Sequence, residues 1–413
     1  MLVDVAVHVV PRSCGRTQIQ PVWVARVVWR AGIVSEAMTS DQQHRRVRVA
    51  LLFGGRSSEH AVSCATAAGV MRAIDRTAYD IIPIGIAPDG RWVVVADDPR
   101  PLELTATNRP EVPADAPSVL VPTSTRDRTL RALDAGEIPS ELGEVDVVFP
   151  VLHGPYGEDG TVQGLLELAD IRYVGSGVLA SAVGMDKHFM KVVFAGAGLP
   201  VGPYAVVPDA RWRHEREAVR DEVAALGLPV FVKPARAGSS MGITKVTDLA
   251  HLDAAIEAAR AHDLKVLVEA AIVGREIECA VLQGHDGAPP RTSRVGEIVV
   301  RPGHGHEFYD FEAKYLDDDA VQLSCPADVP EEVSEAVRGF AARAFTELGC
   351  EGLARVDCFY TSDGDVLVNE INTMPGFTPH SMYPQMWQAS GLTYPQLIDE
   401  LITLALERPL GLR

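Results

Sequence analysis

Two pairs of polar residues near the C-terminus have the types and spacing needed for metal and phosphate chemistry. Arg355 and Asp357 are two residues apart, as are Glu370 and Asn372, so each pair lies on one face of a predicted strand. Two carboxylates and an amide oxygen, with no His or Cys, are ligands suited to Mg²⁺. An arginine beside them can hold a phosphate group. The pattern predicts a metal–phosphate site, and a surface ion pair across a hairpin is the alternative.

The register of this hairpin decides whether the four side chains meet. If the turn pairs Tyr360 with Asp365, Arg355 lies opposite Glu370 and all four polar side chains share one face. The other face then carries Val356, Cys358, Leu367 and Ile371. Asn369 also falls on that apolar face, without an explanation. A slip of one residue would separate the polar set.

A Gly/Ser-rich loop begins near the end of a second predicted strand. Lys233 lies in the apolar run 229–235, and the loop extends to Gly242. An ammonium group can neutralise nucleotide phosphates while loop amides surround their oxygens. The lysine precedes the loop, so this is not the GxxxxGK[ST] phosphate loop. A surface lysine before a flexible linker is the alternative interpretation.

Two loops in the first half of the chain are further candidates. Gly54 and Gly55 join a strand to a helix whose first turn carries Glu59, and a helix N-terminus can bind an anion. An acidic residue also favours this position for helix stability alone. The glycine spacing differs from the dinucleotide fingerprint and disfavours NAD. His153 opens the loop HGPYGEDG, which is typical of a site or of a tight turn.

Two loops in the last third carry weaker signals. Lys314 and Tyr315, in the segment YDFEAKY, could close over a substrate and exclude water. A solvated loop is the simpler interpretation. Further on, Gly376 could bring a backbone N–H to a reacting oxygen, and Ser381 could bind a carboxylate. An ordinary Pro/Gly turn explains this segment equally well.

Positioning these residues requires a layered α/β fold. From Val47 onward, apolar runs alternate with helical stretches, which predicts a mainly parallel first sheet. Residues 97–140, rich in Pro, Asp, Thr and Ala, are expected to be an insertion or a surface excursion. A second block contains a helix over 185–196. A third block, of α+β type, has strands before and after a helix over 330–349.

Composition excludes several classes of protein. The chain has 413 residues, with 56 acidic against 38 basic side chains and a net charge of −18. This length allows two to four domains, and the charge argues against a nucleic-acid partner. No apolar run approaches the roughly 20 residues of a membrane-spanning helix. Six cysteines without paired spacing indicate a reducing compartment, so we expect a cytoplasmic protein without a membrane partner.

The first 45 residues differ from the rest. Residues 1–37 contain four arginines and no lysine, and His8 and Pro11 interrupt their first apolar stretch. This is not the pattern of a signal peptide. We expect a disordered tail or an overlong start, with Met38 as the alternative start. A targeting segment is the other interpretation.

Six segments match, in order, the motifs of the D-alanine–D-alanine ligase family: GGRSSEHAVS, HGPYGEDGTVQG, KPARAGSSMG, YDFEAKY, ARVDCFY and NEINTMPGFTPHS. The resemblance covers about residues 46–410. It implies an ATP-grasp fold, with an N-terminal parallel-sheet α/β domain over 46–180 and ATP-grasp subdomains over 181–272 and 273–413. It also implies that ATP drives the joining of two D-alanines through an acyl phosphate, for peptidoglycan precursor synthesis.

The same resemblance implies the residues that bind ATP and metal. The ligands of two Mg²⁺ ions, for which Mn²⁺ can substitute, would be Asp357, Glu370 and Asn372. The groups near the phosphates would be Lys187, Lys233, Ser240 and Lys314. The adenine and ribose would meet Glu269, the backbone of Ala271 and Ile272, and Glu276. K⁺ is a further candidate activator.

The remaining implied roles concern the two D-alanines. Glu59 would hold the ammonium group of the first, near His153, and Glu59 would also form a hydrogen-bonded triad with Ser239 and Tyr315. Arg355 and the Gly376 amide would stabilise the oxyanion. Ser381 and Met382 would receive the carboxylate of the second D-alanine.

The resemblance also implies a homodimer. It leaves two alternative functions open. A D-alanine–D-lactate ligase, or another amino-acid ligase of the same fold, is the first, but the EAKY form of the Tyr315 loop favours an amine as second nucleophile. The second is an inactive ATP-binding regulatory protein. Such a protein should lack at least one of five residues, all of which are present: Lys233, Arg355, Asp357, Glu370 and Asn372.

Overall fold

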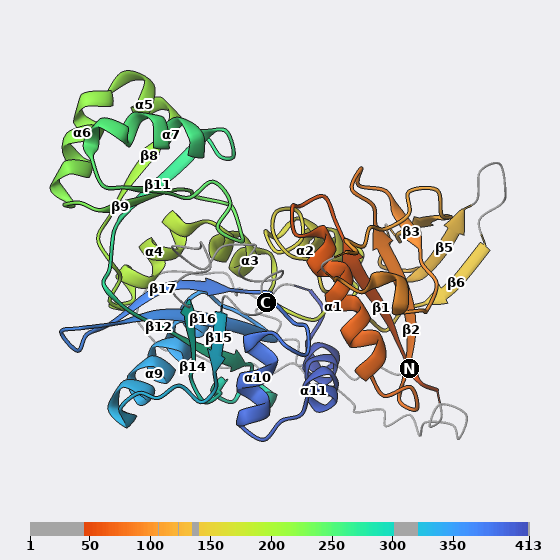
Figure 1. Cartoon of the computed structure of the whole chain (residues 1–413). Coiled ribbons are helices and arrows are strands. Elements are labelled where there is room, and N and C mark those ends of the chain that lie inside the picture. Colours follow the sequence, from red (N-terminus) through yellow and green to blue (C-terminus); the bar gives the residue numbers. More distant parts are fainter. Residues whose placement is uncertain (1–44, 106, 123, 134–139, 301–320, 412–413) are drawn as a thin grey trace, which may run out of the picture. The chain divides into compact units, whose positions relative to one another are not determined.

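The computed structural model describes residues 45–105, 107–122, 124–133, 140–300 and 321–411. Within these ranges the chain forms three β-sheets with helices packed on them (Figure 1). None of the helices in this part of the chain combines the length and the apolar character needed to cross a membrane.

The N-terminal sheet has its strands in the order β6-β5-β4-β3-β2-β1-β7. Their bounds are β1 Val47–Gly54, β2 Tyr79–Ile86, β3 Trp92–Val94, β4 Ser118–Leu120, β5 Thr129–Leu133, β6 Ser140–Glu144 and β7 Val147–Pro150. Strand β1 pairs in parallel with both β2 and β7. The predicted parallel arrangement therefore holds for these three strands, whereas β3 to β6 join the sheet antiparallel.

The segment 97–140 builds much of the antiparallel part of this sheet. It contains β4 and β5, and it buries Leu102, Val112, Val119 and Leu130. The expected surface excursion is thus partly core. Its apolar residues are scattered among Pro, Asp and Thr, so no continuous apolar run marks its strands in the sequence.

Two glycines make the sharp turn from β1 into α1 (His60–Ala73). Gly54 and Gly55 have φ of 87° and 96°, a region in which a residue with a Cβ is strained. A Cβ on Gly54 would also lie 2.4 Å from the Ile86 carbonyl oxygen. The Gly54 N–H donates to Ser63 Oγ at 2.8 Å, which fixes the start of α1 beside the end of β1.

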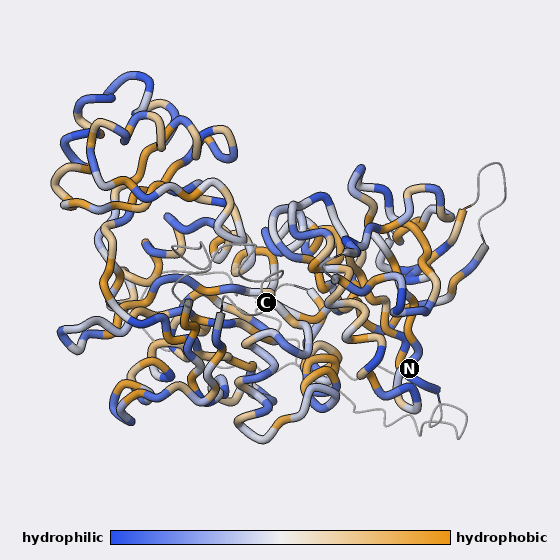
Figure 2. Tube along the Cα trace, viewed as in Figure 1, coloured by the Kyte–Doolittle hydropathy of each residue, from blue (hydrophilic) through white to orange (hydrophobic). Residues whose placement is uncertain are grey.

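The central lobe is built on an antiparallel sheet in the order β10-β9-β11-β8. Its elements are β8 Tyr204–Pro208, α5 Asp209–His214, α6 Arg216–Ala225, β9 Val230–Pro234, β10 Thr244–Val246, α7 Leu252–Arg260 and β11 Lys265–Ala270. It has an apolar core of its own, in which Trp212, Val232 and Ile256 are fully buried. Figure 2 shows this pattern as hydrophobic strands beneath helices whose outer faces are hydrophilic.

The third sheet is antiparallel, in the order β15-β14-β12-β16-β17, with β13 paired to β12. Its strands are β12 Gly274–Leu282, β13 Arg291–Thr292, β14 Gly296–Val300, β15 Val321–Ser324, β16 Leu353–Thr361 and β17 Val366–Asn372. The helices outside the central lobe that remain to be given are α2 Thr161–Leu168, α3 Val178–Met185, α4 Lys187–Gly196, α9 Glu331–Glu347, α10 Met382–Ala389 and α11 Tyr394–Glu407. Short 3₁₀ helices lie at η2 Arg100–Leu102, η3 Leu249–His251 and η4 His285–Gly287.

The two faces of the third sheet belong to different cores. Ile277 and Cys279 pack with α3, α4 and α9, whereas Ala280 and Leu282 pack with α10, α11 and the N-terminal sheet. Alternate residues of β12 thus bind the sheet to helices on both sides, as the two-residue period of a strand requires.

The helix predicted over 185–196 is confirmed as α4, which begins two residues later, at Lys187. Asp186 separates α3 from α4, because its side chain caps α4 and accepts hydrogen bonds from the backbone N–H groups of His188 and Phe189, each at 3.2 Å. Residue 181, the expected start of the central subdomain, lies inside α3. Both α3 and α4 pack on the third sheet.

Candidate active site

A cavity of about 1490 Å³ collects almost all of the predicted site residues. Its lining comes from α1, α4, the central lobe and the third sheet. Of the predicted residues that the structure describes, only Ala271 does not line it; its N–H donates to the Pro229 carbonyl at 3.0 Å. Lys314 and Tyr315 lie outside the described residues.

Glu59 stands at the N-terminus of α1 and points into the cavity. It is 7% exposed, and Ser239 Oγ donates a hydrogen bond to Glu59 Oε1. A Cβ on Gly238 would lie 2.7 Å from Glu59 Oε2, as would one on Gly154. The Gly/Ser loop therefore approaches Glu59 closely, and two of the three expected triad members are in contact.

His153 is buried, at the end of the run predicted from the sequence as a strand. Its Nδ1 lies 3.1 Å from the Met374 carbonyl oxygen, and its Nε2 lies 3.3 Å from Thr66 Oγ1. Burial lowers the pKa of His153, and the charge of Glu59 offsets this only in part. The ring is therefore neutral, with Nδ1–H donating to Met374 and Nε2 accepting from Thr66.

Glu158, in the same loop, was not among the predicted residues. Its Oε1 accepts a hydrogen bond from the Gly154 N–H at 2.8 Å. Burial and then the charge of Glu59 raise the pKa of Glu158 to about 8. The sequence signal was present, since Glu158 is one of the two acids of HGPYGEDG, but its spacing did not distinguish a cavity residue from a turn residue.

Lys233 and Glu269 form a buried ion pair between neighbouring strands of the central sheet. Lys191 Nζ lies 3.1 Å from the other oxygen, Glu269 Oε1. Burial would raise the pKa of Glu269, but the ammonium groups of Lys233 and then Lys191 lower it to about 2. The carboxylate is thus held ionised between two cations.

Lys187, the first residue of α4, joins the central lobe to the third sheet. Its Nζ donates to the Ala237 carbonyl at 2.9 Å and lies 3.8 Å from Glu370 Oε2. The loop after Ala237 continues through Ser239 and Ser240, which both have positive φ. Lys187, Lys233 and this loop surround one side of the cavity, as the phosphate-binding hypothesis requires.

The polar hairpin forms with a register different from the predicted one. Arg355 lies opposite Asn372, and Asp357 lies opposite Glu370, whereas Tyr360 pairs with Val366. The turn lies at residues 362–364, as predicted, but the strand pairing beside it is shifted by one residue. A β-bulge then adds one residue, Asn369, to β17. It lies between the pairs Asp357–Glu370 and Cys358–Val368.

These two one-residue changes together shift the pairing by two residues, so the polar face is retained. Asn369 is the unpaired residue of the bulge, which explains its position. Beyond the bulge the faces exchange: Val368 is fully buried beside Cys358, whereas Leu367, predicted to be in the core, is only half-buried. The predicted apolar set was wrong at this position.

The four polar side chains meet in the cavity. Arg355 binds Asp357 through two hydrogen bonds of 2.7 Å and lies 3.1 Å from Glu278 Oε2. Asn372 Nδ2 donates to Asp357 Oδ2 at 3.0 Å, so the amide oxygen is the atom that Asn372 can offer to a cation. Glu278, on the neighbouring strand β12, was missed because nothing in the sequence indicated which strand would lie beside β16.

This donor set fits a magnesium ion bound together with a nucleotide. Within the described ranges no three His, Cys, Asp or Glu side chains form a ready-made metal site. Two carboxylates and one amide oxygen are hard ligands, and Mg²⁺ commonly takes its remaining ligands from phosphates and water. Glu269 also suits a nucleotide, because its ionised carboxylate lines the same cavity and can accept a hydrogen bond from an amino group.

The loop after β17 also lines the cavity, through Gly376, Ser381 and Met382. Ser381 is the N-cap of α10, and its Oγ lies 2.8 Å from Thr378 Oγ1. The free N–H groups at a helix N-terminus suit a carboxylate. The predicted second-substrate residues thus line the same cavity as the predicted metal ligands.

Comparison with known proteins supports this geometry. The family model for the N-terminus of D-ala D-ala ligase matches residues 48–176, and that for its C-terminus matches residues 193–403. The D-alanine–D-alanine ligase of Arthrobacter sp. (strain FB24) is 65% identical over 370 residues, which cover 90% of this chain and 97% of the relative. That of Streptomyces coelicolor is 56% identical over 374 residues, 89% and 95% of the two chains.

Two solved structures have similar folds. The VanG D-Ala:D-Ser ligase from Enterococcus faecalis matches with a TM-score of 0.74 and 38% identity, covering 87% of this chain and all of the other. The D-alanine–D-alanine ligase from Coxiella burnetii matches with a TM-score of 0.72 and 33% identity, covering 88% of this chain and 94% of the other.

The fold is that of an ATP-grasp enzyme, a class in which ATP activates a carboxylate for attack by a second group. The chain belongs to the D-alanine–D-alanine ligase family. It uses ATP and a divalent metal to join two D-alanines for peptidoglycan synthesis.

Proposed function

We propose that ATP lies in the cavity with its adenine beside Glu269 and Ile272, its ribose beside Glu276 and its phosphates beside Lys187, Lys233 and Ser240. The Glu269 carboxylate supports the adenine position, because it lines the cavity and can accept a hydrogen bond from an exocyclic amino group. The two lysines support the phosphate position. Lys314 is part of this proposal from the sequence alone.

The metal sites form the second part of the proposal. Two Mg²⁺ ions, replaceable by Mn²⁺, would be held by Asp357, Glu370 and Asn372. Bound there, they would neutralise phosphate oxygens and polarise the phosphoryl group that is transferred. Arg355 would exchange part of its bidentate contact with Asp357 for the same phosphoryl group, whose geometry suits a guanidinium.

In the first step, a carboxylate oxygen of the first D-alanine attacks the γ-phosphorus, and the bond to the leaving ADP oxygen breaks. The product is an acyl phosphate. Glu59 holds the ammonium group of this substrate, with Ser239 fixing the carboxylate and neutral His153 lining the same end. Tyr315 would complete the triad over the site.

In the second step, the deprotonated amine of the second D-alanine attacks the acyl carbon, and phosphate leaves from the tetrahedral intermediate. The backbone N–H of Gly376 and the guanidinium of Arg355 stabilise the oxyanion. Ser381 and the N–H of Met382 hold the carboxylate of the second substrate at the start of α10.

Several finer features belong to the same proposal. We propose a cytoplasmic homodimer, with domains over 46–180, 181–272 and 273–413 after an N-terminal extension, and K⁺ as a candidate activator. The cytoplasmic location is supported by the described cysteines, all of which are free thiols: Cys64, Cys279, Cys325, Cys350 and Cys358.

The single observation that carries the proposal is the meeting of Arg355, Asp357, Glu370 and Asn372 in the cavity that also contains Glu59. We expect phosphate release from ATP and Mg²⁺ with D-alanine alone, and D-alanyl-D-alanine as the product by mass. D-Serine or D-lactate added with D-alanine tests the second-substrate site. If D-alanine were joined to D-serine or D-lactate in preference to a second D-alanine, the substrate assignment would be wrong, whereas the ATP-dependent reaction would still stand.

A further inference from the structure

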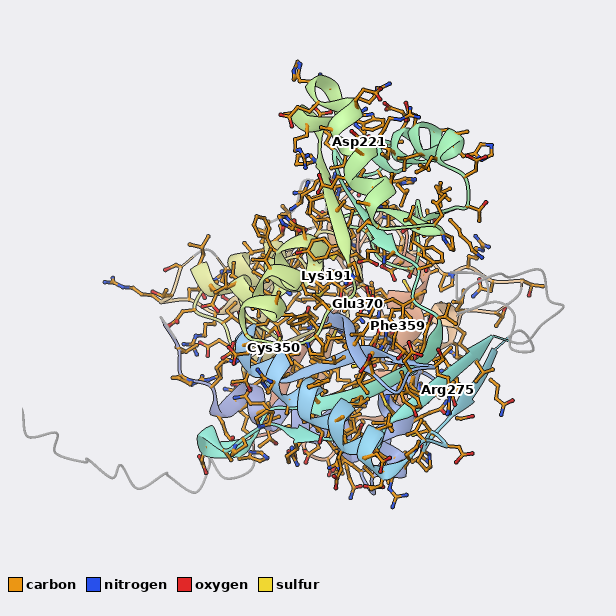
Figure 3. All side chains as sticks on the ribbon, turned by 90° about the vertical axis from the view of Figure 1, so that its left-hand side faces the viewer. Lys191, Asp221, Arg275, Cys350, Phe359 and Glu370 are labelled. Carbon is orange, nitrogen blue, oxygen red and sulfur yellow. The ribbon has the colours of Figure 1, made fainter. Side chains whose placement is uncertain are left out.

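Lys191 is a buried charged residue without a role in the reaction described above. It lies on α4, one turn after Lys187, and it is 2% exposed. Its Nζ is 3.1 Å from Glu269 Oε1 and donates to the Asn369 carbonyl oxygen at 3.1 Å. In Figure 3, Lys191 and Glu370 lie next to each other between the central lobe and the third sheet. Burying an ammonium group is unfavourable unless such partners compensate it.

One partner of Lys191 is the residue that forms the β-bulge. Asn369 has no pairing residue on β16, and β17 is the edge strand of its sheet. The Ile371 N–H, on the other side of Glu370, donates to Met190 Sδ at 3.4 Å. Consecutive α4 residues therefore bind the backbone on both sides of Glu370, so α4 sets the direction in which this proposed metal ligand points.

The other partner is the proposed adenine-binding carboxylate. Glu269 is paired with both Lys191 and Lys233. The reaction described above requires Lys233 to bind phosphate, which would remove one of the two cations from Glu269. Lys191 is then the cation that remains beside the buried carboxylate.

Resting on the proposed roles of Glu269 and Glu370, we propose that Lys191 is a positioning residue that holds the adenine end and the metal end of the nucleotide site in register. Its ammonium group spans the central lobe and the third sheet at the point where the nucleotide must contact both. It orients groups that bind the substrate without contacting the substrate itself.

Lys191→Met in the full chain tests the proposal, because methionine retains the length of the side chain and removes its charge and donors. We expect the KM for ATP and the Mg²⁺ concentration for half-maximal activity each to rise about tenfold, and the KM for D-alanine to change less than twofold. These differences correspond to the loss of one charge-assisted contact at each end. Lys245→Met, at an exposed lysine of β10, is the matched control and should leave all three values unchanged.

The double variant Lys191→Met/Glu269→Gln separates the two ends. If Lys191 acts on adenine binding through Glu269, the double variant should have the same KM for ATP as Glu269→Gln alone. Its raised Mg²⁺ requirement should persist, since that effect passes through Asn369. If the KM for ATP in the double variant rose by the product of the two single-variant effects, Lys191 would not act through Glu269.

A purely structural role for Lys191 would lower the Tm and leave the KM for ATP and the Mg²⁺ requirement unchanged, and this result would overturn the inference. If Lys191→Met does not fold, Lys191→Gln, which retains an amide donor, must still raise the Mg²⁺ requirement. Glu269→Gln and Glu370→Gln test the proposed function in the same series. If Glu269→Gln and Glu370→Gln leave the KM for ATP and the Mg²⁺ requirement unchanged, the site assignment itself fails. If these two variants change them and the Lys191 variants do not, only the inference about Lys191 fails.

Discussion

At the scale of single residues, buried charges in the cavity are compensated unequally. Glu269 is held ionised by two lysines, whereas Glu158 faces Glu59 and has its pKa raised to about 8. A carboxyl that retains its proton near neutral pH can lie beside a second carboxylate without strong repulsion. Glu158 therefore closes the loop around Gly154 and leaves Glu59 as the charged group for a substrate ammonium.

The raised pKa of Glu158 makes stability depend on pH. The folded protein retains this proton up to about pH 8, whereas an unperturbed glutamate releases it near 4.5, so the free energy of unfolding falls as the pH rises between these values. Glu158→Gln removes the effect. In thermal melts without nucleotide, the Tm of the variant relative to the wild type should increase from pH 6 to pH 9. Parallel pH profiles for the two proteins would contradict the raised pKa.

The sequence predicted which residues line the site better than it predicted which residues contact one another there. The motifs identified most of the side chains that line the cavity, because glycines, lysines and acids in loops are unusual enough to stand out. Lys191 and Glu278 were not predicted, since a lysine in an amphipathic helix and a glutamate in a strand are ordinary in sequence. Only the packing of α4 and β12 against the site gives them partners.

At the scale of elements, the hairpin shows what alternation can and cannot predict. The two-residue period correctly placed Arg355, Asp357, Glu370 and Asn372 on one face. It could not predict the bulge, because an extra residue leaves the local pattern of each half-strand unchanged. The one sign was Asn369 on an apolar face.

The loop that carries Ser239 tests how an element positions Glu59. Gly238→Ala would bring a Cβ to 2.7 Å from Glu59 Oε2 and displace the carboxylate. We expect the KM for D-alanine to rise about tenfold to a hundredfold, the range caused by a misplacement of about 1 Å, with little change in Tm.

Gly196→Ala is the matched control for this substitution. Nothing lies within 4 Å of a Cβ at Gly196, in the last turn of α4. The variant should retain wild-type kinetics and gain about 0.5–1 kcal/mol of stability from helix propensity. If both variants had the same KM for D-alanine, close approach of the loop would not be what positions Glu59.

At the scale of the whole molecule, the site depends on elements from separate parts of the sequence. The N-terminal sheet shares a core with α10, α11 and one face of β12, whereas the central lobe has a core of its own. The alternation of strands and helices predicted an α/β protein. It did not predict the antiparallel strands of segment 97–140, whose pairing depends on contacts between residues distant in sequence.

The chain N-terminal to this assembly is expected to be dispensable for catalysis. The family models match residues 48–176 and 193–403, and the described site residues begin at Glu59. Removal of residues 1–37 should therefore leave kcat, the KM for D-alanine and the Tm unchanged. A large loss in any of these would show that the extension contributes to the active enzyme.

The central claim is that the polar face of the β16–β17 hairpin performs the phosphoryl chemistry. Asp357→Asn retains the size of the side chain and removes one metal-binding charge, while Glu278 still pairs with Arg355. Asp363→Asn, in the exposed turn of the same hairpin, is the control. The most direct measurement is the rate of D-alanyl-D-alanine formation, identified by mass, together with the Tm. We predict a fall of at least about a hundredfold for Asp357→Asn, as for loss of one strong electrostatic contact to the transition state, with a nearly unchanged Tm and no change for Asp363→Asn. Wild-type turnover in Asp357→Asn would contradict the account.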